Sequence, residues 1–251
     1  MMQKTLSKEI SFQGNALHTG EVVKVKLIPS AENTGIVFVR EDLECAEIPA
    51  LAKYVNRTDR QTILQKGEAS VGTVEHLMAS LYALGIDNLR IKLNGSEIPI
   101  LDGSAAPLVD LILEAGIKEQ SIEKNFYVLE ETFTFKDEDG SEIMALPSDE
   151  FEVSALIDYG SSVLGPQHAH LDKMVNFRDD IASARTFSFL RELEPLLDAG
   201  LIKGGDLNNA IVYVDQDIAP STLDKLKTAF GRDDVEVTQR GTLNNINLRF
   251  S

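Results

Sequence analysis

Four histidines occur among the 251 residues, and His76 has the most informative surroundings. It falls in the stretch 73–84, where apolar residues recur at the spacing of a helix. His76 lies off that apolar stripe, on a face that carries the small residues Ala79, Ser80 and Ala83. Because small residues let a second layer approach closely, we expect His76 to point into a crevice. Spacing alone leaves two interpretations open, a structural histidine or a metal ligand.

Glu75 directly precedes His76. Neighbouring helical residues diverge in direction, so the two side chains cannot both bind one ion squarely. They can instead place a ligand and a carboxylate on adjoining walls of one pocket, as in a metal site whose general base is not a ligand. The alternative is that Glu75 only stabilises the helix N-terminus electrostatically.

The other histidines are less specific. His168 and His170 have the i, i+2 spacing that would let two imidazoles on a strand share a metal, but their polar, glycine-containing neighbourhood favours a surface loop. His18 follows an expected strand and would line a site or merely form a turn.

Two short segments could supply donors to a reacting group. Thr186 interrupts two helical stretches, where its hydroxyl would donate to an oxyanion or act as an ordinary helix cap. Gly205 belongs to the tight turn 203–206, which would bring backbone N–H groups near a ligand, although such turns usually bind none.

Short strands and helices must position these residues. Alternation predicts strands at 10–12, 23–27 and 36–39 in a half-exposed antiparallel sheet, with a further strand at 89–93. The expected helices are 73–84 and 108–115. Thr73 and Ser104 are their expected N-caps, and Gly85 and Gly116 their stops.

The polar run 118–124 is the best candidate for a domain boundary, because the pattern restarts after it. A strand meander is predicted over 127–157. A helical stretch from 189 to Gly200, a strand at 210–214, a helix at 221–230 and strands near 235–237 and 247–250 follow it. This order predicts an α+β protein with two domains, 1–120 and 121–251.

Composition excludes some classes of function. The net charge of −16 argues against a nucleic-acid surface, which needs a clustered basic face. The one cysteine, Cys45, favours a reduced intracellular protein. No stretch approaches the about 20 apolar residues of a membrane helix, and the start lacks the apolar core of a signal peptide. We therefore expect a cytoplasmic protein.

Several segments resemble, in order and over most of the chain, the UDP-3-O-acyl-N-acetylglucosamine deacetylase family of lipid A biosynthesis. The most specific are Thr73-Val74-Glu75-His76 and Asp102-Gly103-Ser104-Ala105. The remaining ones are Leu17-His18-Thr19-Gly20, Gly85-Ile86-Asp87-Asn88, Glu97-Ile98-Pro99-Ile100-Leu101 and Ala184-Arg185-Thr186-Phe187. Residues 201–210 are most similar to the branch fused to a 3-hydroxyacyl-carrier-protein dehydratase, so a fused or partner dehydratase is expected.

The resemblance implies two domains of similar topology whose helical layers pack face to face around the site. It also implies zinc-dependent hydrolysis of the N-acetyl group of a UDP-sugar that carries an acyl chain. His76 would be the first Zn²⁺ ligand and Glu75 the general base. Thr186 would steady the oxyanion, with Phe187 beside it.

The resemblance further implies an apolar passage for the acyl chain. The segment that runs from Leu193 through Ile202 and Leu207 to Val212 corresponds to it, although a packed core would look the same. His18 and Gly205 complete the expected substrate contacts.

The chain departs from the family pattern in its metal ligands. The family takes its other two ligands from a His-Lys-x-x-Asp helix, and no such motif occurs before Ser251. We therefore expect this chain itself to be inactive, as a shortened deacetylase. One alternative is a non-catalytic substrate-binding protein. The other is a relocated metal site of His76 with His168 and His170.

Overall fold

A computed structural model describes residues 1–199 and 203–244, apart from the side chain of Leu197. The fold class is α+β, as predicted. The main sheet has five strands in the order β2-β3-β9-β4-β5. Their bounds are Ile10–Asn15 (β2), Val22–Pro29 (β3), Leu89–Leu93 (β9), Ile36–Arg40 (β4) and Ala46–Pro49 (β5). The pair β4 and β9 is parallel, so the sheet is mixed rather than antiparallel throughout.

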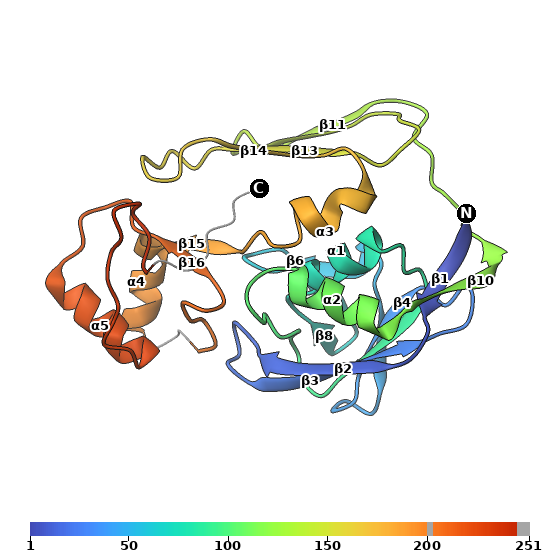
Figure 1. Ribbon diagram of the computed structural model, residues 1–251, viewed down its shortest axis with the longest axis horizontal. Coiled ribbons are helices and arrows are strands. Elements are labelled where there is room, and N and C mark those ends of the chain that lie inside the picture. Colours follow the sequence, from blue (N-terminus) through green and yellow to red (C-terminus); the bar gives the residue numbers. More distant parts are fainter. Residues whose placement is uncertain (200–202, 245–251) are drawn as a thin grey trace.

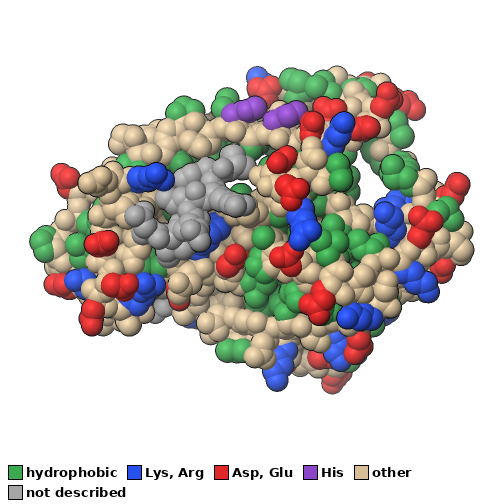
Figure 2. Space-filling view, viewed as in Figure 1, with side chains coloured by type: hydrophobic (Ala, Val, Ile, Leu, Met, Phe, Trp, Pro, Cys, Tyr) green, Lys and Arg blue, Asp and Glu red, His purple; other side chains and the backbone are tan. Residues whose placement is uncertain are grey.

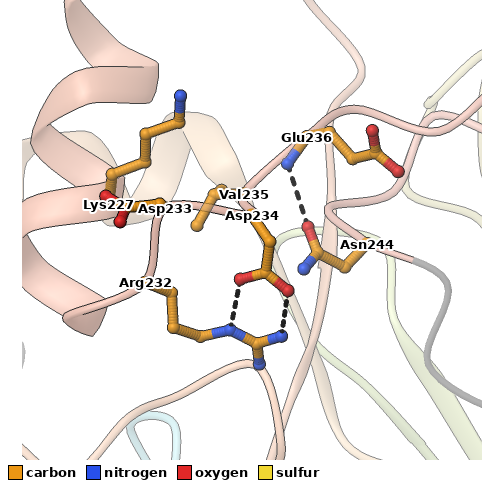
Figure 3. A pocket seen from close by; sticks show the side chains of 7 residues that line it. All are labelled: Lys227, Arg232, Asp233, Asp234, Val235, Glu236 and Asn244. Atoms are coloured by element: carbon orange, nitrogen blue, oxygen red, sulfur yellow. Dashed lines mark hydrogen bonds and ion pairs between the residues drawn. The ribbon is translucent and has the colours of Figure 1, made fainter.

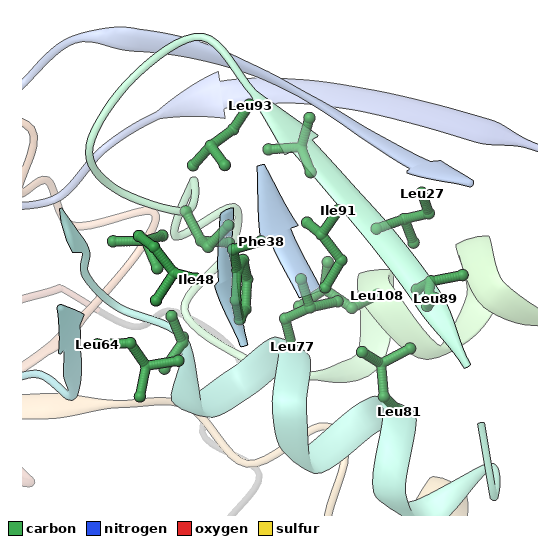
Figure 4. Close-up of a cluster of buried hydrophobic side chains, with 14 of the residues drawn as sticks. Leu27, Phe38, Ile48, Leu64, Leu77, Leu81, Leu89, Ile91, Leu93 and Leu108 are labelled. Carbon is green, nitrogen blue, oxygen red and sulfur yellow. The ribbon is translucent and has the colours of Figure 1, made fainter. Parts of the chain in front are cut away.

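Two helices, α1 (Glu75–Ala83) and α2 (Ala106–Ala115), pack with this sheet around the core of the first half. Figure 4 shows Leu77 and Leu81 of α1 directed toward Ile91 and Leu89 of β9. Both leucines are buried, and each such side chain contributes about 1.5–3 kcal/mol when fully removed from water. The apolar stripe of the predicted helix is therefore what anchors α1, and with it Glu75 and His76.

The helix ends differ in part from the prediction. Thr73 is not an N-cap of α1, because its hydroxyl donates to Glu97 instead and Val74 takes the cap position. Gly85 follows α1 with φ +70, as expected. At α2, the N-cap is Ala105 rather than the expected Ser104, although the Ser104 hydroxyl accepts the N–H of Ala106 at 3.3 Å and so satisfies one free donor of the first turn.

The rest of the first half is built from small sheets. The strands β6 (Val55–Arg57), β7 (Ile63–Lys66) and β8 (Ala69–Val71) form one, after the 3₁₀ turn Ala52–Tyr54. The polar run expected as a boundary is strand β10 (Ile117–Glu123), which pairs with β1 (Met2–Leu6). The division of the chain at residue 120 stays a prediction.

The second half begins with two hairpins that run along the top of Figure 1. They pair β11 (Phe133–Lys136) with β12 (Glu142–Ala145), and β13 (Val153–Ile157) with β14 (Gln167–Leu171). The 3₁₀ turn Met174–Asn176 and α3 (Phe177–Asp180) lead back toward α1 and α2.

The chain then forms a separate unit at the left of Figure 1. Strand β15 (Phe187–Phe189) pairs in parallel with β16 (Ile211–Tyr213), and helices α4 (Leu190–Asp198) and α5 (Pro220–Phe230) pack together. Within the described residues, every sheet of the second half has two strands, so the five-stranded topology of the first half is not repeated there.

Two details of the second half differ from expectation. Residues 127–129 form no strand, and near 235–237 only an isolated bridge joins Val237 to Leu243. The expected helix end at Gly200 and the strand at 247–250 lie outside the described residues. No helix in the described part of the chain is long and apolar enough to span a membrane.

Candidate functional site

Glu75 and His76 occupy the first turn of α1, as the sequence predicts. Burial lowers the pKa of His76, and the carboxylates of Glu75 and Asp102 act in the opposite direction. A partly buried imidazole whose pKa is lowered is neutral near pH 7, which is the form that binds metals. Glu75 Oε2 accepts the backbone N–H of Thr62 at 3.0 Å, so the carboxylate has a fixed partner.

Asp102 and Gly103 connect this helix to the second half of the chain. The N–H of Thr186 donates to the Gly103 carbonyl at 2.8 Å, and Arg185 Nε donates to the Asp102 carbonyl at 2.7 Å. No residue with a side chain fits at position 103, because a Cβ would collide with the carbonyl of Asn209. The structure therefore brings Thr186 to the loop whose carboxylate acts on His76.

Asp102 and Arg185 are functional candidates that the residue patterns alone did not single out. Both lie in the segments of family resemblance, which was the available signal. Arg185 Nη1 and Nη2 are buried and have no hydrogen-bond partner among the described residues. Burial lowers the pKa of Arg185, whereas the carboxylates of Asp102 and Asp206 raise it.

The turns that contain His18 and Gly205 lie side by side. The N–H of Gly204 donates to the Leu17 carbonyl at 3.2 Å, and a Cβ at Gly204 would collide with the carbonyl of Ala16. The His18 side chain is partly buried, and its Nε2 has no hydrogen-bond partner within the part of the chain that the structure describes. These two expected substrate contacts therefore share one region, although a role for either stays a prediction.

The residues of the expected acyl passage lie in a packed cluster. Leu207 and Val212 are buried with residues of α4 and α5, and Leu193 packs against the edge of this cluster. Phe187 makes edge-to-face ring contacts with Phe189 and Tyr213. Ile202 lies outside the described residues.

His168 and His170 lie on strand β14, so the expectation of a loop is wrong. The pairing of β14 with β13 overrides the glycine-containing neighbourhood on which that expectation rested. Both side chains are exposed, and His170 Nδ1 is 2.8 Å from the Ser154 hydroxyl. Histidine side chains are visible on the outer surface over this hairpin in Figure 2.

The side chains near His76 that could donate to a metal ion show whether the site fits such an ion. The neutral imidazole of His76 suits one coordination position. Within residues 1–199 and 203–244, however, no group of three or more His, Cys, Asp or Glu side chains could hold a metal. A catalytic zinc normally takes three protein ligands, so the described residues do not complete such a site. The same finding argues against the relocated site with His168 and His170.

A polar cavity of ≈ 570 Å³ lies elsewhere, beside α5. Figure 3 shows that Arg232 points to Asp234, and the two form a bidentate ion pair at 2.8 and 2.7 Å. Because this guanidinium already has a carboxylate partner, the cavity is a weak candidate for an anion-binding site. The region around His76 remains the better candidate for the functional site.

The fold and site together define an α+β protein in which the partly buried imidazole of His76 lies near the carboxylates of Glu75 and Asp102. The family model described as UDP-3-O-acyl N-acetylglycosamine deacetylase matches residues 3–227. The chain belongs to this family.

Its relatives are of two kinds. The chain is 45% identical over 247 residues to a "Bifunctional enzyme LpxC/FabZ" of Bacteroides thetaiotaomicron, covering 98% of this chain and 54% of the relative. It is 46% identical over 212 residues to a "UDP-3-O-acyl-N-acetylglucosamine deacetylase" of Myxococcus xanthus, covering 84% and 67%. The chain thus spans about half the length of the bifunctional relatives that it matches.

Proposed function

We propose that this protein contributes the site for removal of the N-acetyl group from UDP-3-O-acyl-N-acetylglucosamine in lipid A biosynthesis. The observation that carries the proposal is the placement of Glu75 and the partly buried His76 at the start of α1, beside the Asp102–Gly103 loop that contacts Thr186. Family membership and the printed names of the relatives support the same substrate.

Each residue has a distinct role in the proposed reaction. Glu75 accepts the proton of the attacking water as general base while the water oxygen bonds to the acetamide carbon. The C–N bond then breaks, so that acetate is released and the departing amine takes up a proton. The Thr186 hydroxyl donates a hydrogen bond to the oxyanion that forms on the acetamide carbon. His76 stays neutral and provides one nitrogen ligand for zinc. The chemistry that a bound zinc ion supplies is a lower pKa of water and polarisation of the carbonyl.

At least one further zinc ligand would come from outside the described residues, since these contain no group of three His, Cys, Asp or Glu side chains that could hold a metal. We further propose a cytoplasmic location, which the single Cys45 supports, and a fused or partner dehydratase, which the bifunctional relatives support.

The test is acetate release from UDP-3-O-acyl-N-acetylglucosamine by the complete gene product. We expect turnover that is abolished by a zinc chelator and restored by added zinc. Turnover that persists after complete zinc removal, or none with zinc at full occupancy, would contradict the proposal.

A second candidate, a non-catalytic substrate-binding protein, is favoured by the lack of a group of three metal-binding side chains among the described residues. Zinc content of the purified 251-residue chain addresses the metal site directly. We expect well below one equivalent after dialysis. One tightly bound equivalent, lost in His168→Gln, would instead support the relocated site. If the complete gene product also lacks turnover but binds the UDP-sugar, the binding function holds.

A further inference from the structure

Glu97 is a buried carboxylate that the proposed reaction does not use. Its side chain accepts the backbone N–H groups of His18 at 3.1 and 3.2 Å and of Thr19 at 3.0 Å. It also accepts the hydroxyl of Thr73 at 2.8 Å. The residue is 2% exposed, and burying an ionised carboxylate is unfavourable unless donors of this kind surround it.

Thr73, one of these donors, has an unusual backbone conformation. Its φ is +54, in the left-handed region that a β-branched residue rarely adopts. The next residue, Val74, is already helical with φ −82 and ψ −16. The bend at Thr73 therefore sets the direction in which α1 leaves the sheet, and such strain persists only where the surroundings hold it.

The backbone beside Thr73 is fixed to the segment that carries Glu97. The N–H of Gly72 donates to the Ser96 carbonyl at 2.9 Å, and the N–H of Ile98 donates to the Gly72 carbonyl at 3.0 Å. Glu97 thus has little freedom to move relative to Thr73. The carboxylate that accepts the Thr73 hydroxyl is therefore held in place by the backbone bonds to Gly72 on one side and by its bonds to the His18 turn on the other.

We infer that Glu97 is a positioning residue for the catalytic helix. It holds Thr73 in the left-handed conformation and thereby fixes the orientation of Glu75 and His76, two and three residues further on. It also ties that orientation to the turn of His18. The catalytic part of this inference rests on the proposed function, whereas the structural part does not.

A series of substitutions at residue 73 separates the effect of the hydroxyl from the effect of the backbone conformation. Thr73→Ser keeps the hydroxyl and should behave as the parent. Thr73→Ala loses the hydroxyl and disfavours positive φ, so α1 should reorient. Thr73→Gly loses the hydroxyl but adopts positive φ freely, so it should keep the helix direction better than Thr73→Ala. Glu97→Gln should resemble Thr73→Ala, because an amide N–H₂ would face the N–H groups of His18 and Thr19.

The first readout is the His76 ring signal in ¹H–¹³C NMR spectra of this chain. We expect it to move in Thr73→Ala and Glu97→Gln, and to stay in place in Thr73→Ser. The control is Thr5→Val, which removes a buried hydroxyl whose 2.6 Å bond to the Asn88 carbonyl lies after the C-terminal end of α1, whereas His76 is in its first turn. It should lower stability without moving the His76 signal. An unmoved His76 signal in Glu97→Gln and Thr73→Ala, or equal shifts in Thr73→Gly and Thr73→Ala, would overturn the inference.

The second readout is turnover by the complete gene product. We expect kcat to fall by about 10²-fold in Glu97→Gln with KM little changed, the effect of misplaced reacting groups. Rescue by Thr73→Ser relative to Thr73→Ala is also expected. A shifted His76 signal together with an inactive parent would count against the proposed function alone. Full activity in Glu97→Gln with an active parent would overturn the positioning role.

Discussion

His76 is held between opposing influences. Burial disfavours its charged form, and the carboxylates of Glu75 and Asp102 favour it. The net effect is a pKa below the ordinary value, so the folded protein binds this proton less tightly than the unfolded chain does. Protonation of His76 therefore works against folding.

This residue makes stability depend on pH in a definite direction. The unfolded chain binds more protons than the folded protein between the lowered and the ordinary pKa, so stability falls as pH falls through that window. The loss from His76 is absent above the ordinary value and complete below the lowered one. His76→Gln should reduce the slope, by at most about 1.4 kcal/mol per pH unit.

Urea unfolding at a series of pH values measures this effect. The control is His168→Gln, whose exposed side chain should leave the curve unchanged. Parallel curves for the parent and His76→Gln would show that His76 is not buried as described.

At the scale of elements, α2 offers a matched pair of leucines. Leu108 is 2% exposed and packs in the main core, whereas Leu113, on the same helix, is 37% exposed. Leu108→Ala should lower the free energy of unfolding by about 2–5 kcal/mol because it leaves a cavity. Leu113→Ala should change it by about 0.5 kcal/mol or less.

Denaturant unfolding of both variants tests this difference. Equal losses would mean that α2 does not pack against the sheet through the face that contains Leu108.

The sequence allowed the elements with strong periodicity to be predicted. Strand β9 has the predicted bounds, and both ends of α1 and of α5 lie within two residues of the predicted positions. The expected N-cap at Thr73 was wrong because a distant carboxylate, Glu97, competes for its hydroxyl. Similarly, β14 was missed because pairing with β13 outweighs local composition.

The site was predictable only in part. Glu75 and His76 were recognisable from their own helix. The contacts between the Asp102–Gly103 loop and residues 185–186 join positions about eighty residues apart, and no local pattern reveals them. The roles of Glu75, His76 and Thr186 stay predictions until tested.

At the scale of the whole molecule, the two halves meet through a small apolar cluster. It includes Ala105 and Val109 of the α2 region together with Leu171, Phe177 and Ala182 of the second half. Ala83 of α1 lies against it, which agrees in part with the expectation that the small-residue face of α1 admits a second layer, whereas Ala79 of that face is exposed.

The hairpins β11–β12 and β13–β14 carry many exposed apolar side chains, among them Phe135, Ile143 and Leu156. Contiguous apolar surface of this kind binds hydrophobic dyes and promotes association. The double variant Phe135→Ser, Leu156→Ser should therefore bind less of the dye ANS than the parent.

Fluorescence titration with ANS provides the measurement. The control is Val22→Ser, which removes an isolated exposed side chain on β3 and should leave dye binding unchanged. Equal dye binding by the parent and the double variant would show that the hairpins are covered.

The central claim is that the carboxylate at the start of α1 performs the proton transfer in deacetylation. It is tested most directly by acetate release from UDP-3-O-acyl-N-acetylglucosamine in the complete gene product carrying Glu75→Gln. We expect kcat to fall by at least about 10²-fold with zinc content unchanged, while Glu68→Gln, an exposed glutamate in the turn before β8, retains parental turnover. Parental turnover in Glu75→Gln would contradict the account.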